Sequence, residues 1–139
     1  MGNYPPILLK EDLTMLEVYS LNVTVPADSP VPFNNVSIQK GCTAKLNGVS
    51  TIELNKCGVY MVECDASASA TTTLQLFKNG VAQPQAQSTG GTPAFTTLVQ
   101  VTENNCGCPC SSPTNLQIRN TADAEATLTN VNVVVTKLV

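Results

Sequence analysis

The sequence predicts an all-β fold, and three observations point to it. Charged residues make up only 12% of the 139 residues, against about 25% in ordinary globular domains. Thr, Asn, Ser and Gln take their place, and Thr together with Val favours strands over helices. From Phe33 onward, short segments of alternating apolar and polar residues recur between turn signals. The chain length suits one sandwich or barrel domain with a core of its own.

The first part of the chain differs from the rest. We expect residues 1–32 to form an N-terminal arm that holds one or two strands, and residues 33–139 to form the domain. Tyr4-Pro5-Pro6 is rigid and extended, and the segment from Leu13 to Leu21 has the one helix-like composition in the chain, although it is short. Pro26, Pro30 and Pro32 mark the end of the arm.

The domain is expected to begin with short strands at 36–39 and 50–54, the second following a turn at Leu46-Asn47-Gly48. The next strand, 58–70, shows period-two alternation, with Tyr60, Val62 and Cys64 on one face. The strand at 73–77 follows and ends at Lys78-Asn79-Gly80-Val81. Asn-Gly tolerates the positive φ angles of a type I′ turn, so this tetrapeptide predicts a hairpin.

The hairpin returns as a strand at 82–88, and Gly90-Gly91-Thr92-Pro93 forms a loop. The strand at 95–102 places Phe95, Thr97 and Val99 on one face, and strands at 116–120 and 126–139 complete the set. The total of roughly eight to ten strands, at spacings of about 8–12 residues, is typical of a β-sandwich or barrel.

Composition argues against several classes of function. The chain has no histidine, so the commonest general base and the commonest non-thiolate zinc ligand are both missing. A cysteine nucleophile needs a base, and Glu103 is a poor substitute, so we expect no enzyme and no cofactor. The net charge is −3 with scattered Lys and Arg, which argues against nucleic-acid binding. No apolar run approaches the roughly 20 residues of a membrane span, and no signal-peptide pattern opens the chain.

The six cysteines allow fifteen disulfide pairings. Residues i and i+2 of an extended chain lie about 6.5–7 Å apart, at the limit of disulfide geometry. The triplet Cys106, Cys108 and Cys110 is therefore expected to pair outside itself, with Cys57 and Cys42 as candidate partners, although Gly107 and Pro109 bend the chain there. Free thiols, or a soft-metal site formed by the triplet, remain as alternatives. Cys64 faces inward and is expected to act as a small buried hydrophobe.

Several segments taken together resemble the C1q/TNF-like jelly-roll family, especially its bacterial and phage branch. That branch includes the C-terminal domains of spore-surface collagen-like glycoproteins and phage head decoration or fibre proteins. The resemblance covers about Phe33 to the C-terminus. It rests on the order of Ser50-Thr51-Ile52-Glu53-Leu54, Gly58-Val59-Tyr60-Met61-Val62, Leu74-Gln75-Leu76-Phe77-Lys78-Asn79-Gly80, Thr97-Leu98-Val99-Gln100-Val101 and Leu116-Gln117-Ile118-Arg119-Asn120. Two departures are the missing collagen-like stalk and the added Cys106–Cys110 loop.

The resemblance implies a jelly-roll sandwich that forms compact homotrimers, with one sheet of each protomer facing the threefold axis. Neutral polar strands give independent support for an oligomer, because they carry little charge to block association. A stalkless domain with a short arm is similar to a phage capsid decoration or head-fibre protein, assembled in the host cytoplasm and displayed on the virion surface. A C1q-like module that recognises glycans or a host surface is the alternative, and a component of a bacterial spore or cell surface is a second one.

The arm is the candidate segment for attachment to a particle. Its apolar residues would be costly to leave in water, so they are expected to dock onto the capsid or another particle surface; a free terminal tail is the competing interpretation. The docking candidates are Tyr4, Pro5, Pro6, Ile7, Leu8 and Leu9.

Overall fold

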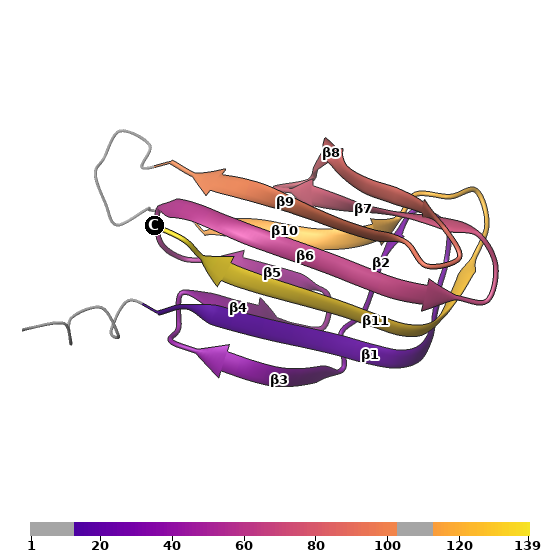
Figure 1. The fold of residues 1–139 in the computed structure, drawn as a ribbon, viewed down its shortest axis with the longest axis horizontal. Coiled ribbons are helices and arrows are strands. Elements are labelled where there is room, and N and C mark those ends of the chain that lie inside the picture. The colour runs from indigo at the N-terminus through magenta and orange to yellow at the C-terminus, as the bar shows by residue number, and fades with distance from the viewer. Residues whose placement is uncertain (1–12, 103–112) are drawn as a thin grey trace, which may run out of the picture.

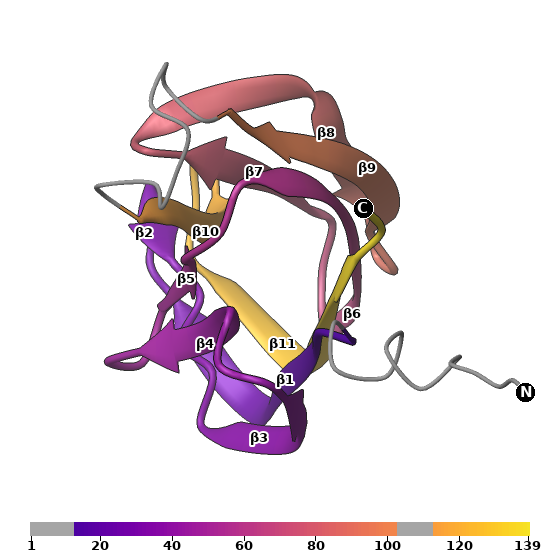
Figure 2. The same cartoon turned by 90° about the vertical axis from the view of Figure 1, so that its left-hand side faces the viewer.

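The computed structural model of the protein describes residues 13–102 and 113–139. Every regular element within these residues is a strand, and the strands build two facing antiparallel sheets (Figures 1 and 2). The predicted all-β jelly-roll sandwich is confirmed. The strands are β1 Met15–Val25, β2 Ser29–Pro30, β3 Asn35–Lys40, β4 Ala44–Asn47, β5 Thr51–Leu54, β6 Gly58–Ala68, β7 Thr72–Lys78, β8 Val81–Gly90, β9 Ala94–Val101, β10 Thr114–Asn120 and β11 Ala126–Lys137.

The two sheets interleave strands that are distant in the sequence. We call the five-stranded sheet, in the order β3-β1-β11-β6-β9, sheet A. The six-stranded sheet runs β4-β5-β10-β7-β8, with the short β2 also paired to β10, and we call it sheet B. Every ladder is antiparallel, and most join strands far apart in the chain, such as β1 and β11. The fold therefore depends on long-range pairing, and each sheet has one face on the core and one outward face.

The core lies between the sheets and is built by period-two alternation. Strand β6 buries Tyr60, Val62 and Cys64, and β11 buries Val131, Val133 and Val135 against sheet B. Sheet B supplies the larger leucine and isoleucine side chains of the same cluster. Because successive side chains point to opposite faces, the same alternation fixes which residues face outward.

The predicted strands from 36–39 to 126–139 are confirmed with shifts of one or two residues at their ends. The predicted β7–β8 hairpin is also confirmed, because Asn79 and Gly80 both have positive φ angles, 50° and 82°. Strand β4 was not predicted; it is four residues long and forms a hairpin with β5 across the Leu46-Asn47-Gly48 turn. A strand this short carries too little alternation to be recognised.

The predicted boundary at residue 32 does not separate an arm from the domain. Residues 15–25 form β1, which lies inside sheet A between β3 and β11, and β2 pairs with β10 in sheet B. The helix-like composition from Leu13 to Leu21 is overridden because Leu16, Val18 and Ser20 alternate and are fully buried. Residues 13–32 therefore belong to the sandwich, and residues 1–12 lie outside the described part of the chain.

A buried asparagine at the end of β10 ties this strand to the end of β1, the start of β7 and the loop that follows β10. The side chain of Asn120 is fully buried, and its Nδ2 donates to the carbonyl oxygens of Val25 at 3.1 Å and Ala124 at 3.0 Å. Its Oδ1 accepts from the backbone N–H of Ala122 at 2.9 Å and from Thr72 Oγ1 at 3.2 Å. The amide is thus satisfied at both ends, as a buried polar group must be, and it closes one end of the sandwich.

Candidate functional site

The outward face of sheet A carries a row of large apolar side chains. The ladders place Met15 opposite Thr136, Thr136 opposite Met61, and Met61 opposite Leu98, so these residues line up across four strands. The exposed fraction of the side chain is 36% for Met15 and 57% for Leu98. We call Met15, Met61 and Leu98 the apolar row. Thr136 of β11 lies between Met15 and Met61 in this row. Exposed apolar side chains gathered on one face are typical of a protein–protein contact.

Further rows on the same face become more polar. The next row crosses the sheet as Ile38, Glu17, Val134, Glu63 and Thr96. Ile38 is 40% exposed and extends the apolar surface, while Ser37 Oγ donates to Glu17 Oε1 at 2.6 Å.

The row beyond it holds Tyr19, Asn132 and Asp65. Glu63 and Asp65 border a shallow depression of about 290 Å³ together with Phe95 and Val134. Neither carboxylate has a hydrogen-bond or ion-pair partner among the described residues. On this face the apolar row is therefore followed by two rows that carry the carboxylates of Glu17, Glu63 and Asp65. Beyond them Leu21 of β1 is again apolar and 57% exposed.

The cysteines that the structure describes occupy three different environments. Cys57 is disulfide-bonded, and its partner lies outside the described residues, because Cys42 and Cys64 both carry free thiols. Cys42, a candidate for a disulfide in the sequence, is instead an exposed free thiol in the β3–β4 connection. The proposed partners and low-weight metal ligands Cys106, Cys108 and Cys110 lie outside the described residues.

Cys64 matches the expectation of a buried hydrophobe. Its side chain is only 2% exposed, and burial, with a smaller contribution from the charge of Asp65, raises the pKa of the thiol from 9.0 to about 12. The thiolate is the nucleophilic form of cysteine, so this thiol is chemically inert at neutral pH. Burial likewise raises the pKa of Tyr60, whose hydroxyl donates to the carbonyl oxygen of Lys56 at 2.6 Å.

The described residues bring together no cluster of metal ligands. No group of three or more Cys, Asp or Glu side chains within 13–102 and 113–139 lies close enough to hold a metal ion. The same residues contain no helix long and apolar enough to cross a membrane. Glu103, considered above as a base, lies outside the described residues.

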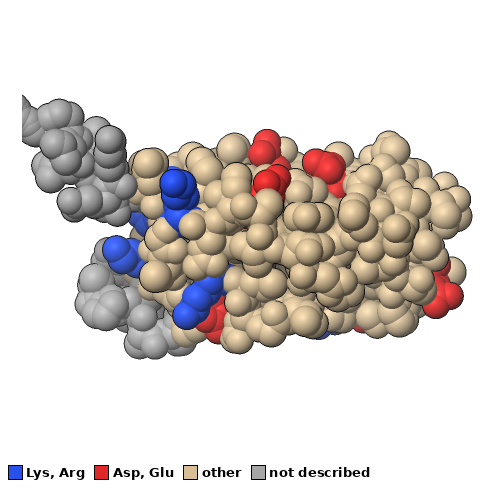
Figure 3. Space-filling model, turned by 90° about the horizontal axis from the view of Figure 1, so that it is seen from below, with Lys and Arg blue, Asp and Glu red and all other residues tan. Residues whose placement is uncertain are grey.

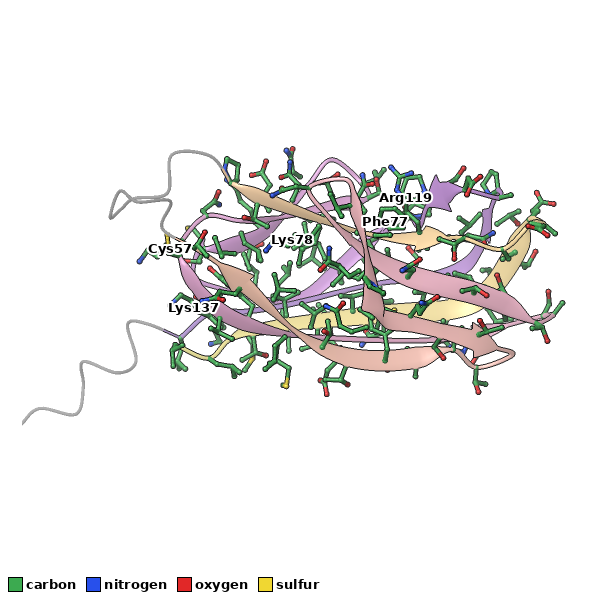
Figure 4. The ribbon with its side chains drawn as sticks, turned by 90° about the horizontal axis from the view of Figure 1, so that it is seen from above. Cys57, Phe77, Lys78, Arg119 and Lys137 are labelled. Atoms are coloured by element: carbon green, nitrogen blue, oxygen red, sulfur yellow. The ribbon has the colours of Figure 1, made fainter. Side chains whose placement is uncertain are left out.

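Charge is distributed unevenly between the two ends of the sandwich. Lys56 and Lys137 border a depression of about 240 Å³ at the end where β1 begins and β11 finishes, and Figure 4 shows Lys137 and Cys57 at this end. We call it the terminal pole. Asp28, Asp123 and Glu125 lie in connections at the opposite end, which we call the loop pole. In Figure 3 the blue side chains gather toward the terminal pole, and red ones lie along the middle and at the loop pole.

The two-sheet arrangement is shared with solved structures. The globular domain of zebrafish complement 1qA superposes with a TM-score of 0.67 at 12% identity, covering 91% of this chain and 97% of that one. The Eiger TNF of S. frugiperda gives a TM-score of 0.70 at 14% identity, covering 91% and 93%. The fold is that of the C1q/TNF-like jelly roll. No protein-family model matches the sequence, and no curated protein sequence matches it either.

A viral protein shares the same jelly roll. The vertex protein P5 of PRD1 superposes with a TM-score of 0.60 at 11% identity, covering 91% of this chain and 97% of that one. At such identities the likeness concerns the fold, and no site residue is carried over from these proteins.

The sequence did not reveal the apolar row, although it contained part of the signal. The alternation that identified the inward residues Tyr60 and Val62 also marks Met61 as outward, and the same applies to Leu98 between Thr97 and Val99. Strand register brings Met15, Met61 and Leu98 together, and register is not visible in the sequence. The docking candidates Tyr4 to Leu9 lie outside the described residues.

Proposed function

We propose that the protein is a non-catalytic structural module that forms a homotrimer through the outward face of sheet A. The observation that carries the proposal is the apolar row, in which Met61 and Leu98 lie next to each other and Leu98 is 57% exposed. Burying such side chains against symmetry mates contributes about 25 cal/mol per Å² of apolar area. The resemblance to the C1q/TNF-like family, in which one sheet faces the threefold axis, supports an interface made by one sheet, and the apolar row is our reason for choosing sheet A.

The acidic part of the face determines how the protomers meet. Glu17, Glu63 and Asp65 would repel their symmetry copies if all were desolvated at the centre of an interface. We therefore place the apolar row in the dry centre and the carboxylates at the hydrated rim, which is the usual arrangement of protein interfaces.

We further propose that the trimer is displayed on a particle, as a phage capsid decoration or head-fibre protein on the virion surface. Support comes from the likeness to the PRD1 vertex protein P5 and from the apolar segment Tyr4 to Leu9, which supplies a docking peptide ahead of β1. Display on a bacterial spore or cell surface uses the same trimer and is the alternative location. An arm that becomes resistant to protease only when the purified particle is present would favour the virion.

The mass of the protein in solution tests the trimer. We expect light scattering to give a mass near three times 14.6 kDa. The double variant Met61→Glu with Leu98→Glu places charges at the dry centre and should reduce the mass to that of a single chain, because an unpaired buried charge costs several kcal/mol. Circular dichroism should show that the variant keeps its strands, since both side chains point away from the core.

The control is Val81→Glu, at the start of β8 in sheet B. Val81 is 61% exposed, close to the value for Leu98, so the change adds the same charge at a similarly exposed apolar position away from sheet A. This variant should remain trimeric. A folded double variant that stays trimeric would show that another face forms the interface, and a monomeric wild-type protein would refute the trimer itself.

A further inference from the structure

The outward face of sheet B carries a depression unlike the other surfaces described above. It holds about 300 Å³ and is lined by residues of β5, β7, β10 and the β7–β8 turn, with no charged side chain among them. This volume is at the small end of ligand sites, which span about 300–1,000 Å³. The lining residues are Thr51, Phe77, Asn79, Gly80, Asn115 and Gln117.

An aromatic ring with a fixed orientation forms the apolar part of this depression. Phe77 is half-buried on the outward face of β7, and the guanidinium carbon of Arg119 lies 5.0 Å from the centre of its ring. Figure 4 shows the two side chains together. Such a cation–π contact holds the ring in place, while the ring still borders the depression.

The amide of Gln117 is also held in place, from both of its ends. Its Nε2 donates to Thr51 Oγ1 at 3.0 Å, and its Oε1 accepts from Arg119 Nε at 3.1 Å. Arg119 therefore fixes both the ring and the amide. A surface ordered in advance loses less conformational entropy when a ligand binds.

Two further amides at the rim have unused hydrogen-bonding groups. Asn79 Oδ1 accepts from the backbone N–H of Asn115 at 2.8 Å, which leaves both hydrogens of Asn79 Nδ2 directed elsewhere. Neither Nδ2 of Asn79 nor the side-chain amide of Asn115 has a partner within the described part of the chain. The rim thus offers amide donors and acceptors beside an aromatic ring.

We propose that this depression binds a neutral saccharide. A pyranose ring has an apolar C–H face that packs on an aromatic ring and hydroxyl groups that pair with amides. Arg119 covers one face of the Phe77 ring, so the sugar would pack on the part of the ring that borders the depression, beside the amides. The absence of charge among the lining residues favours an uncharged ligand. An added peptide strand is a poorer fit, because the β5, β7 and β10 backbones beneath the depression are already paired within sheet B.

The site does not depend on the trimer proposed above. Sheet B faces away from the outward face of sheet A, so one binding site belongs to each chain whether or not three chains assemble. In a trimer, three copies would act together and increase the apparent affinity for a glycan-covered surface.

Saturation-transfer NMR with the full-length protein tests the proposal. The probes are glucose, galactose, mannose, N-acetylglucosamine and N-acetylgalactosamine, with N-acetylneuraminic acid as a charged comparison. We expect transfer to the ring C–H protons of at least one neutral sugar, with a dissociation constant on the order of millimolar. Phe77→Ala and Asn115→Ala should each weaken binding by about tenfold or more, and Phe77→Tyr should retain it.

The control is Gln85→Ala, which removes an exposed amide of β8 outside the depression and should leave binding unchanged. Retained binding in both Phe77→Ala and Asn115→Ala, no transfer to any neutral sugar, or stronger binding of N-acetylneuraminic acid would each overturn the proposal. Repeating the measurement with Met61→Glu/Leu98→Glu separates the two proposals. The sugar should bind each chain of that variant as in the wild type, and loss of binding there would contradict a site contained in one protomer.

Discussion

Cys64 lies opposite Val133 of β11 and Phe95 of β9 in the centre of sheet A. Its burial was predictable, because it shares the inward face with Tyr60 and Val62, and alternation along one strand is visible in the sequence. The raised pKa of its thiol was not predictable, because the shift depends on how completely sheet B and the neighbouring strands exclude water from the thiol. Unlike Cys42, which is exposed, Cys64 should react with alkylating reagents only when the protein unfolds.

The raised pKa of the Cys64 thiol should make the free energy of unfolding fall as the pH rises above about 9. The folded thiol has a pKa of about 12 and the reference value is 9.0, so its contribution is complete below about pH 9 and is lost as pH rises toward 12, at about 1.4 kcal/mol per pH unit. Urea unfolding between about pH 8 and about pH 11 should show a shallower decline for Cys64→Ala than for wild type. The raised pKa of Tyr60 acts in the same direction in both proteins, and identical slopes would contradict the assignment to Cys64.

Asn120 shows the limit of sequence reasoning at a single residue. The segment 116–120 was recognised as a strand, but nothing local indicates that its last amide is fully buried. The partners are Val25, 95 positions away, Thr72 and the following loop. Burial of a polar side chain is decided by distant segments that satisfy its hydrogen bonds, and these become visible only when the fold is assembled.

At the scale of elements, the strands that could be predicted from the sequence are those with long and regular alternation of apolar and polar residues. Strands β6, β9 and β11 were identified because several consecutive inward positions are apolar. The sequence predicts one or two strands before residue 33 but does not place β1, because Leu16, Glu17 and Tyr19 suit a helix locally and the strand is stabilised by β11, over 100 residues later in the chain. Tertiary pairing overrode local preference there.

The start of β6 should be sensitive to any side chain. Gly58 has a φ of +149°, a region that other residues rarely adopt, and a Cβ there would collide with the carbonyl oxygen of Val139 and touch Lys137 Cε at 3.0 Å. Gly58→Ala should therefore lower the free energy of unfolding by about 2–3 kcal/mol, measured by urea denaturation.

Gly91→Ala is the matched control, because an added Cβ at Gly91 meets nothing within 4 Å. It should change stability by less than about 0.5 kcal/mol. Equal effects of the two substitutions would refute the steric explanation for Gly58.

At the scale of the whole molecule, the fold was predictable and the surfaces were not. The number, order and spacing of strands indicated the jelly roll. The apolar row, by contrast, joins side chains from β1, β6 and β9, and the contact between Phe77 and Arg119 joins β7 to β10. Both depend on register between strands, whereas the sequence displays only the pattern within each strand.

Reduction should affect stability without changing the mass. Cys57 is disulfide-bonded within the single chain, and no cysteine side chain forms part of the apolar row. We expect reductant to lower the free energy of unfolding by about 2–4 kcal/mol while light scattering still reports a trimer. A trimer that falls apart on reduction would instead indicate that the bond of Cys57 joins different chains in solution.

The two poles of the sandwich have a practical consequence. The backbone N–H of Lys137 donates to the carbonyl oxygen of Thr14 at 3.2 Å, so the chain enters and leaves the sandwich at one end, while residues 121–125 turn at the other (Figure 1). A partner fused after Val139 and a segment inserted at 121–125 would therefore project in opposite directions. The domain could therefore serve as an oriented scaffold, attached to a support at the terminal pole and displaying an epitope or enzyme at the loop pole.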